Sequence, residues 1–276
     1  MSASAQRGNK VKNLEKINEY TYALITPYKD IFTTVYFVKT DVGALLFDTA
    51  SYACDVEDSI LPALGKLGIG KDELKYIFIS HNHTDHAGGL DDLLKAYPNA
   101  CIVSRSESLK EKFEGYVFLS PIDGETLLDS LSVVSVEGHT KDSAALYDNR
   151  TKTLISGDCL QLYGIFGSGN WGANISFSTE YAKAIEKLRR MDIDAILTAH
   201  DYHPCGRMYF GKAEVASALD NCLAPFELIK ALIDEDPEAS DEMICERYNS
   251  QNDLPKLGAH VVRKYRGALN NKGETL

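Results

Sequence analysis

The sequence predicts an α+β fold over residues 1–210 and a helical extension over residues 211–276. Two observations support this prediction. Between residues 20 and 198, short apolar runs rich in β-branched and aromatic residues alternate with stretches of helical periodicity. After residue 211 no convincing strand pattern remains, and prolines separate the helix-like stretches. A hydrophobic content of 44% is enough for a sizeable core.

In the first part, strands are predicted where apolar residues alternate or run together between turn residues. These segments are 20–25, 32–39, 44–47, 76–79, 100–104, 116–119, 131–136, 144–147, 153–155 and 193–198. Helical spacing predicts helices over 55–67, from about 90 to 97, over 106–114 and after Ser178. Pro62 predicts that the first of these helices starts late or bends. In the last helix, the predicted buried stripe is Tyr181, Ile185 and Leu188.

The extension is predicted to be helical throughout, with its helices over 213–224, 226–233, 241–248 and 261–266. Pro225 and Pro237 are expected to break the helical pattern, because proline lacks the N–H that the helix needs. The segment is too small to need its own core, so it is expected to shape a pocket or to form an interface between copies of the chain.

Charge and composition narrow the function classes. The 29 basic and 40 acidic residues give a net charge of −11, which disfavours nucleic acid as the main partner and leaves a small-molecule substrate. No apolar stretch approaches the roughly 20 residues of a membrane helix. The first ten residues contain no apolar signal region, and six scattered cysteines are expected to be reduced. We therefore expect a cytoplasmic protein.

The richest cluster of metal-binding side chains follows the strand predicted over 76–79. His81, His83, Asp85 and His86 precede two glycines in a predicted loop. In extended backbone, side chains two residues apart share a face, so His81 and His83 can bind one ion, while Asp85 and His86 are placed to reach a second. Imidazole and carboxylate suit zinc, iron or manganese. The alternative is a polar loop that happens to be rich in histidine.

This H-x-H-x-D-H pattern resembles the signature of the metallo-β-lactamase superfamily. The resemblance covers about residues 15–210 and implies a four-layer αβ/βα sandwich. It also requires a histidine, an aspartate and a histidine farther along the chain, each at a strand end. His139, Asp158 and His200 stand in these places. The resemblance then assigns His81, His83 and His139 to one metal, Asp85, His86 and His200 to the other, and Asp158 to a bridge between them.

Other residues support or modify this pattern. Asp48 ends a predicted buried strand, where it either orients a ligand from behind or caps the next turn. The superfamily often has Pro-Gly-Ser after the His-Thr pair, but here Lys141-Asp142-Ser143 follows, which changes the expected substrate environment. His203 is interpreted as a structural or supporting residue.

Within the superfamily, the chain resembles glyoxalase II and lactonase-like hydrolases more than other branches. The β-lactamases usually lack an aspartate at the Asp158 position, and flavodiiron proteins have glutamate in place of the second histidine. Glyoxalase II places basic residues in a C-terminal helical part to bind glutathione. Arg263, Lys264 and Arg266 are candidates for that role by location alone.

The implied function is that of a dinuclear metallohydrolase, with zinc expected and manganese or iron as alternatives. A hydroxide bridging the two cations would attack an ester, thioester, lactone or phosphodiester. Asp85 and Asp158 are the expected catalytic carboxylates, and Tyr163, in a Gly-rich aromatic stretch interpreted as a lid or a surface loop, is a candidate oxyanion donor. A mononuclear iron persulfide dioxygenase and a non-catalytic metal-binding protein are the alternatives.

Overall fold

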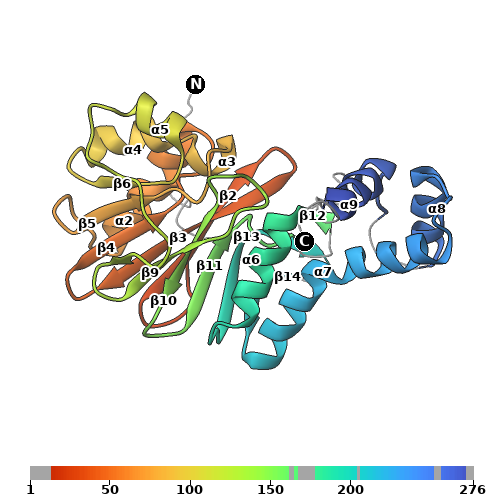
Figure 1. The fold of residues 1–276 in the computed structure, drawn as a ribbon. Coiled ribbons are helices and arrows are strands. Elements are labelled where there is room, and N and C mark those ends of the chain that lie inside the picture. Colours follow the sequence, from red (N-terminus) through yellow and green to blue (C-terminus); the bar gives the residue numbers. More distant parts are fainter. Residues whose placement is uncertain (1–13, 162–164, 167–177, 204–205, 252–255, 272–276) are drawn as a thin grey trace, which may run out of the picture. The chain divides into compact units, whose positions relative to one another are not determined.

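The computed structural model describes residues 14–161, 165–166, 178–203, 206–251 and 256–271 (Figure 1). The chain forms two compact units, one through Val134 and one from Ser135 onward. Each unit contains a sheet with helices, so the predicted α+β class is confirmed. The boundary at 210/211 between a catalytic domain and an extension stays a prediction.

The first unit is built on a seven-stranded sheet whose strands follow one another in chain order. Strands β1 to β4 pair antiparallel, and β4 to β7 pair parallel. The strands are β1 Leu14–Lys16, β2 Thr21–Tyr28, β3 Ile31–Thr40, β4 Gly43–Phe47, β5 Leu74–Phe78, β6 Cys101–Val103 and β7 Phe118–Leu119. Because β4, β5 and β6 run parallel, their carboxyl ends, including the residues after Phe47 and Phe78, meet at one edge of the sheet.

Helices cover one face of this sheet (Figure 1). They are α1 Ala53–Asp55, the π-helix η1 Val56–Ile60, α2 Leu61–Lys66, α3 Thr84–Ala87, α4 Leu90–Ala96 and α5 Glu107–Lys112. Pro62 lies in the first turn of α2, directly after the π-helix, in a run that is helical from Ala53 to Lys66. Alternate strand residues such as Val35 and Phe37 form a buried core with helical residues such as Leu64 and Leu93. A short hairpin of β8 Thr126–Leu127 and β9 Leu131–Ser135 follows.

The second unit has a sheet in the order β12, β13, β11, β10, with β14 also paired to β13. Its elements are β10 Ala144–Asp148, β11 Thr153–Gly157, β12 Ile165–Phe166, α6 Thr179–Arg189, β13 Ala195–His203 and β14 Gly206–Phe210. Strands β10 and β11, both predicted as strands, form an antiparallel hairpin, and β11 runs parallel to β13. Ser178 caps α6 by accepting the N–H of Tyr181, and Tyr181, Ile185 and Leu188 are buried as predicted.

The C-terminal helices are α7 Lys212–Glu235, α8 Asp241–Gln251 and α9 Ala259–Asn271. The expectation that Pro225 breaks the first of them is wrong, because Pro225 lies inside the continuous α7. Burial explains the tolerance: Cys222, Pro225 and Phe226 all face a core, and their packing offsets the helical bond that proline removes. Within the described ranges, no helix combines the length and hydropathy needed to cross a membrane. The five cysteines of these ranges are free thiols.

Candidate metal centre

His81 and His83 form the first half of the predicted ligand cluster. The backbone after β5 stays extended, and His83 is the N-cap of α3 with φ −92° and ψ 155°. The two rings meet edge to face, with 2.9 Å between His81 Nε2 and His83 Nδ1. His81 is buried, whereas His83 is exposed. This is the shared face that the two-residue spacing predicts, and two imidazole nitrogens this close suit coordination of one cation.

Asp85 and His86 lie on the one-turn helix α3, where the sequence predicted a loop. Both side chains are buried, and His86 Nε2 is 3.4 Å from Asp85 Oδ2. The hydroxyl of Thr33, on β3, donates to the same Asp85 oxygen at 3.2 Å. Sequence reasoning missed Thr33, because this contact joins residues 52 positions apart and leaves no local pattern. The helical turn directs Asp85 and His86 toward each other, as a shared ligand site requires.

Asp48 orients His86 from the side opposite to Asp85. Asp48 Oδ2 is 2.7 Å from His86 Nδ1, and the Ser80 N–H and hydroxyl donate to the same carboxylate at 2.8 and 2.9 Å. Complete burial raises the pKa of Asp48, and the bonds from His86 and Ser80 lower it part of the way back. Because a carboxylate accepts, His86 donates through Nδ1, which leaves Nε2 as the atom that can bind a metal. The orienting role is therefore the one that the structure supports.

Replacing Asp48 by asparagine is expected to weaken metal binding about 10- to 100-fold, the usual cost of losing the partner of a ligating histidine. The asparagine keeps the shape of the side chain, but its amide can donate as well as accept, so it no longer fixes the proton of His86 on Nδ1. Competition with a chromogenic chelator measures the dissociation constant. Asp148→Asn is the matched control, because Asp148 is an equally buried carboxylate that pairs with Arg150 instead of a histidine. Equal affinities for the two variants would contradict the orienting role.

The second unit places its three predicted ligands together. Asp158 directly follows β11, and His200 lies on the neighbouring parallel strand β13, so the sheet brings them to one edge. His139 lies in the loop after β9, and its Nε2 is 3.6 Å from Asp158 Oδ2. His200 Nε2 is 3.2 Å from Asp158 Oδ1. The two carboxylate oxygens of Asp158 thus face different imidazoles.

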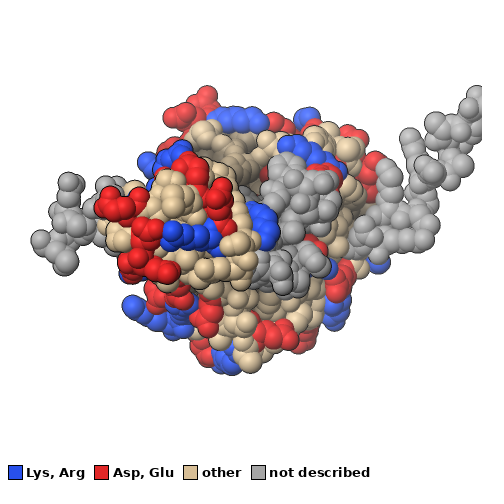
Figure 2. Space-filling model, turned by 90° about the vertical axis from the view of Figure 1, so that its right-hand side faces the viewer, with Lys and Arg blue, Asp and Glu red and all other residues tan. Residues whose placement is uncertain are grey.

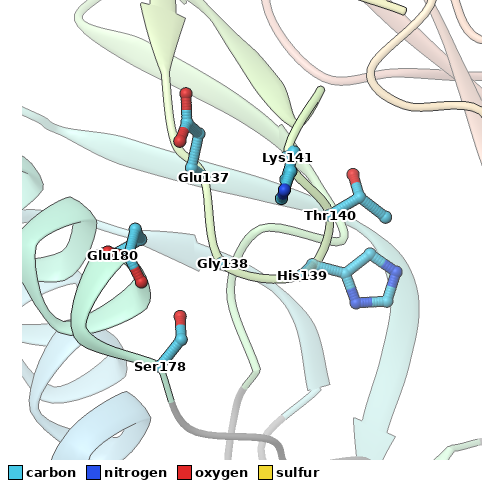
Figure 3. Close-up of a pocket in the computed structure, with 7 residues that line it drawn as sticks. All are labelled: Glu137, Gly138, His139, Thr140, Lys141, Ser178 and Glu180. Atoms are coloured by element: carbon cyan, nitrogen blue, oxygen red, sulfur yellow. The ribbon is translucent and has the colours of Figure 1, made fainter. Parts of the chain in front are cut away.

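A pocket of about 570 Å³ opens beside His139 in the second unit (Figure 3). The described residues that line it come from the loop after β9 and from the start of α6: Glu137, Gly138, His139, Thr140, Lys141, Ser178 and Glu180. The hydroxyl groups of Thr140 and Ser143 share a hydrogen bond of 2.7 Å, which holds the loop in a tight turn. Lys141, the first residue at which the sequence departs from the family pattern, lines the pocket.

Two residues singled out in the sequence have side chains outside the described part of the chain. Tyr163, the candidate oxyanion donor, lies outside the described residues, as does most of the segment interpreted as a lid. His203 ends β13, but its side chain is also outside the described ones.

The basic residues of α9 are engaged with neighbouring helices. Arg263 and Arg266 pair with Asp241 at 3.3 and 3.1 Å, and Arg266 also donates to the carbonyl of Ala239 at 2.9 Å. Figure 2 shows Lys and Arg side chains lying next to Asp and Glu on the face that it presents. These bonds give Arg266 a role in holding α9 to the start of α8, and they count against the glutathione-binding role considered for it.

Solved structures share the fold. A metallo-beta-lactamase family protein of Thermus thermophilus matches with a TM-score of 0.63 and 18% identity, over 94% of this chain and 95% of that one. Rubredoxin oxygen:oxidoreductase of Desulfovibrio gigas matches with a TM-score of 0.61 and 20% identity, over 78% of this chain and 62% of that one. At these identities the likeness shows the fold alone.

Curated relatives match by sequence. Beta-lactamase-like protein 2 homolog of Caenorhabditis elegans is 25% identical over 202 residues, which are 69% of this chain and 64% of that protein. A hydroxyacylglutathione hydrolase of Rippkaea orientalis is 31% identical over 170 residues, which are 57% and 63% of the two chains. The chain thus spans less than two thirds of either relative's length. The family model of the metallo-beta-lactamase superfamily matches residues 28–200, and the chain belongs to that superfamily.

Proposed function

We propose that the chain is a hydrolase that holds two divalent cations and cleaves an ester-type bond in a small molecule. The observation that carries this proposal is the placement of Asp158, whose Oδ1 and Oδ2 face His200 and His139 respectively. A carboxylate directed to two separate imidazoles has the geometry of a ligand shared by two cations. Two carboxylates among otherwise neutral ligands leave such a pair of cations with net positive charge, which favours an anionic nucleophile and a developing oxyanion.

The family resemblance supplies the assignment of ligands within the proposal. One cation takes His81, His83 and His139, the other takes Asp85, His86 and His200, and Asp158 is shared. The donor set of imidazoles and carboxylates suits zinc, which is the proposed ion, and it also suits manganese and iron. The tautomer that Asp48 imposes on His86 fits this assignment, since it presents Nε2 as a ligand atom.

The proposed chemistry is attack by a water-derived nucleophile. When bound, divalent cations lower the pKa of water toward neutrality and polarise the substrate oxygen that becomes negative. Asp85 is held through Oδ2 by the Thr33 hydroxyl, so its carboxylate has a defined direction. We assign to Asp85 the roles of orienting the attacking water and accepting its proton.

The substrate class follows from the relatives and the pocket. Several relatives are named hydroxyacylglutathione hydrolase, which favours a thioester or a related ester among the bonds considered: ester, thioester, lactone and phosphodiester. The pocket beside His139 is the proposed place for a substituent of the substrate, next to the reacting bond. A small-molecule partner and a cytoplasmic location belong to the same proposal.

Metal content by elemental mass spectrometry is the first test, on protein purified without chelator or added metal. About two zinc or manganese ions per chain, together with turnover in a panel of ester, thioester, lactone and phosphodiester substrates, is the expected result. Dialysis against chelator should remove metal and activity in parallel, and readdition of zinc should restore both.

Two results would contradict the proposal. One iron per chain, with oxygen uptake in the presence of a glutathione persulfide, would identify a dioxygenase. Full metal loading without turnover of any substrate in the panel would favour a non-catalytic metal-binding protein.

A further inference from the structure

We infer that Tyr181 is a positioning residue. It fixes the position of the segment that carries His139 relative to the segment that carries Asp158. The inference rests on the proposed metal centre and concerns only the second unit. Tyr181 is the third residue of α6 and is fully buried. It contacts the chain next to both ligands, through its backbone and ring on one side and through its hydroxyl on the other.

The first contact is with Gly138, which directly precedes His139. Gly138 has φ +145°, a conformation that favours glycine. A Cβ atom at this position would lie 2.6 Å from Tyr181 Cβ and 2.7 Å from Tyr181 Cα. The peptide before His139 therefore lies directly against the backbone of α6. The positive φ and this close approach together explain why a glycine precedes His139.

The second contact is made by the Tyr181 hydroxyl, which accepts the N–H of Gln161 at 3.2 Å. Gln161 is three residues after Asp158, and every residue from 157 to 161 is buried. The same hydroxyl donates to the carbonyl of Cys222 on α7 at 3.4 Å. One phenol thus links the segment after Asp158 to a helix of the core, at a place that water does not reach.

Burial explains why a hydroxyl is useful there. Burial raises the pKa of Tyr181 well above its ordinary value, so the phenol stays neutral and keeps the proton that it donates. Buried backbone groups need partners, and here one side chain serves a donor and an acceptor together.

Two roles can be separated by experiment. As a packing residue, Tyr181 would need only its ring, which phenylalanine also supplies. As a positioning residue, it also needs the hydroxyl, because losing the bond to the Gln161 N–H removes one of the constraints on the segment that carries Asp158. A ligand displaced in this way changes the geometry at the metal, which is observable without any catalysis.

The test compares Tyr181→Phe with the wild-type holoenzyme. The matched control is Tyr147→Phe, because the Tyr147 hydroxyl also donates to a backbone carbonyl, that of Asp192, which is not in a segment that carries a proposed ligand. The readouts are the zinc dissociation constants from chelator competition and the visible absorption spectrum of the cobalt-substituted protein. We expect Tyr181→Phe to weaken the weaker zinc site about 10-fold and to alter the cobalt spectrum, as the loss of an outer partner does. Tyr147→Phe should change neither.

Unchanged zinc affinity and an unchanged cobalt spectrum in Tyr181→Phe would overturn the inference while leaving the proposed function intact. A wild-type protein that binds no metal would instead overturn the proposed function. Should Tyr181→Phe fail to fold, 3-fluorotyrosine at position 181 keeps the packing and weakens the hydroxyl as an acceptor. A smaller loss of zinc affinity is then expected, and no loss would again refute the positioning role.

Discussion

His83→Ala is expected to lose bound metal and hydrolytic activity together, while the protein stays folded. His83 is exposed, so its removal leaves no cavity in the core, unlike removal of the buried His81 or His86. Its Nδ1 lies 2.9 Å from His81 Nε2, and these two nitrogens are the first pair of proposed ligand atoms. Losing a direct ligand should weaken the site by more than the roughly 10- to 100-fold cost of losing a supporting partner.

The measurements are metal content and turnover on the same preparations, with circular dichroism as the check on folding. His260→Ala is the matched control, because His260 is an exposed histidine on α9, far along the chain from the ligand cluster. The control should retain full metal content and turnover. A His83→Ala protein that holds its metal and still turns over substrate would exclude His83 as a ligand.

Gly88→Ala is expected to destabilise the protein by about 3 kcal/mol, at the upper end of the usual cost of overpacking. A Cβ on Gly88 would lie 2.2 Å from the carbonyl oxygen of Ser51 and 2.4 Å from that of Thr84. Both obstacles are backbone atoms, which cannot move aside as a flexible side chain can. The clash would separate α3, which carries Asp85 and His86, from the turn after β4.

Thermal unfolding measures this effect, and the expected fall in Tm is about 6–12 °C for a chain of this size. Gly65→Ala provides a control within the same unit, because nothing lies within 4 Å of a Cβ at that position in α2. There the substitution should stabilise the protein by about 0.5–1 kcal/mol. A Gly88→Ala protein as stable as the Gly65→Ala protein would show that the backbone of the turn after β4 can shift to accommodate the added Cβ at little cost.

The elements that sequence predicted well are those with repeated local signals. The strands at β3, β4 and β5 and the helix α6 each contain several residues that obey one period, and Ser178 marks the start of α6. The strands β1, β8 and β12 were missed, because two or three residues carry too little periodicity, and β14 was missed as well. The same reason explains α3, a single turn that the sequence presented as a loop.

The candidate ligands could be named from the sequence because four of them form a compact motif and the others follow or end predicted strands. The residues that hold them could not. Thr33 reaches Asp85 from another strand, and Tyr181 reaches Gln161 from a helix, through contacts that only the folded chain creates. Asp48 was the exception, since its place at the end of a buried strand suggested the supporting role. Pro225 failed as a helix breaker because tertiary packing outweighed the local preference.

The network around Asp48 has a consequence for how the protein acquires its metal. The bonds from Ser80 and His86 to Asp48, and the bond from Thr33 to Asp85, contain no metal atom, so folding alone can set these side chains in place. Under the proposed function, the centre would then form in two stages, with the polypeptide folding first and the ions entering afterwards. Since geometry, ligand type and metal availability together select among first-row metals, the ions supplied to the finished chain would help to decide which of them the proposed centre holds.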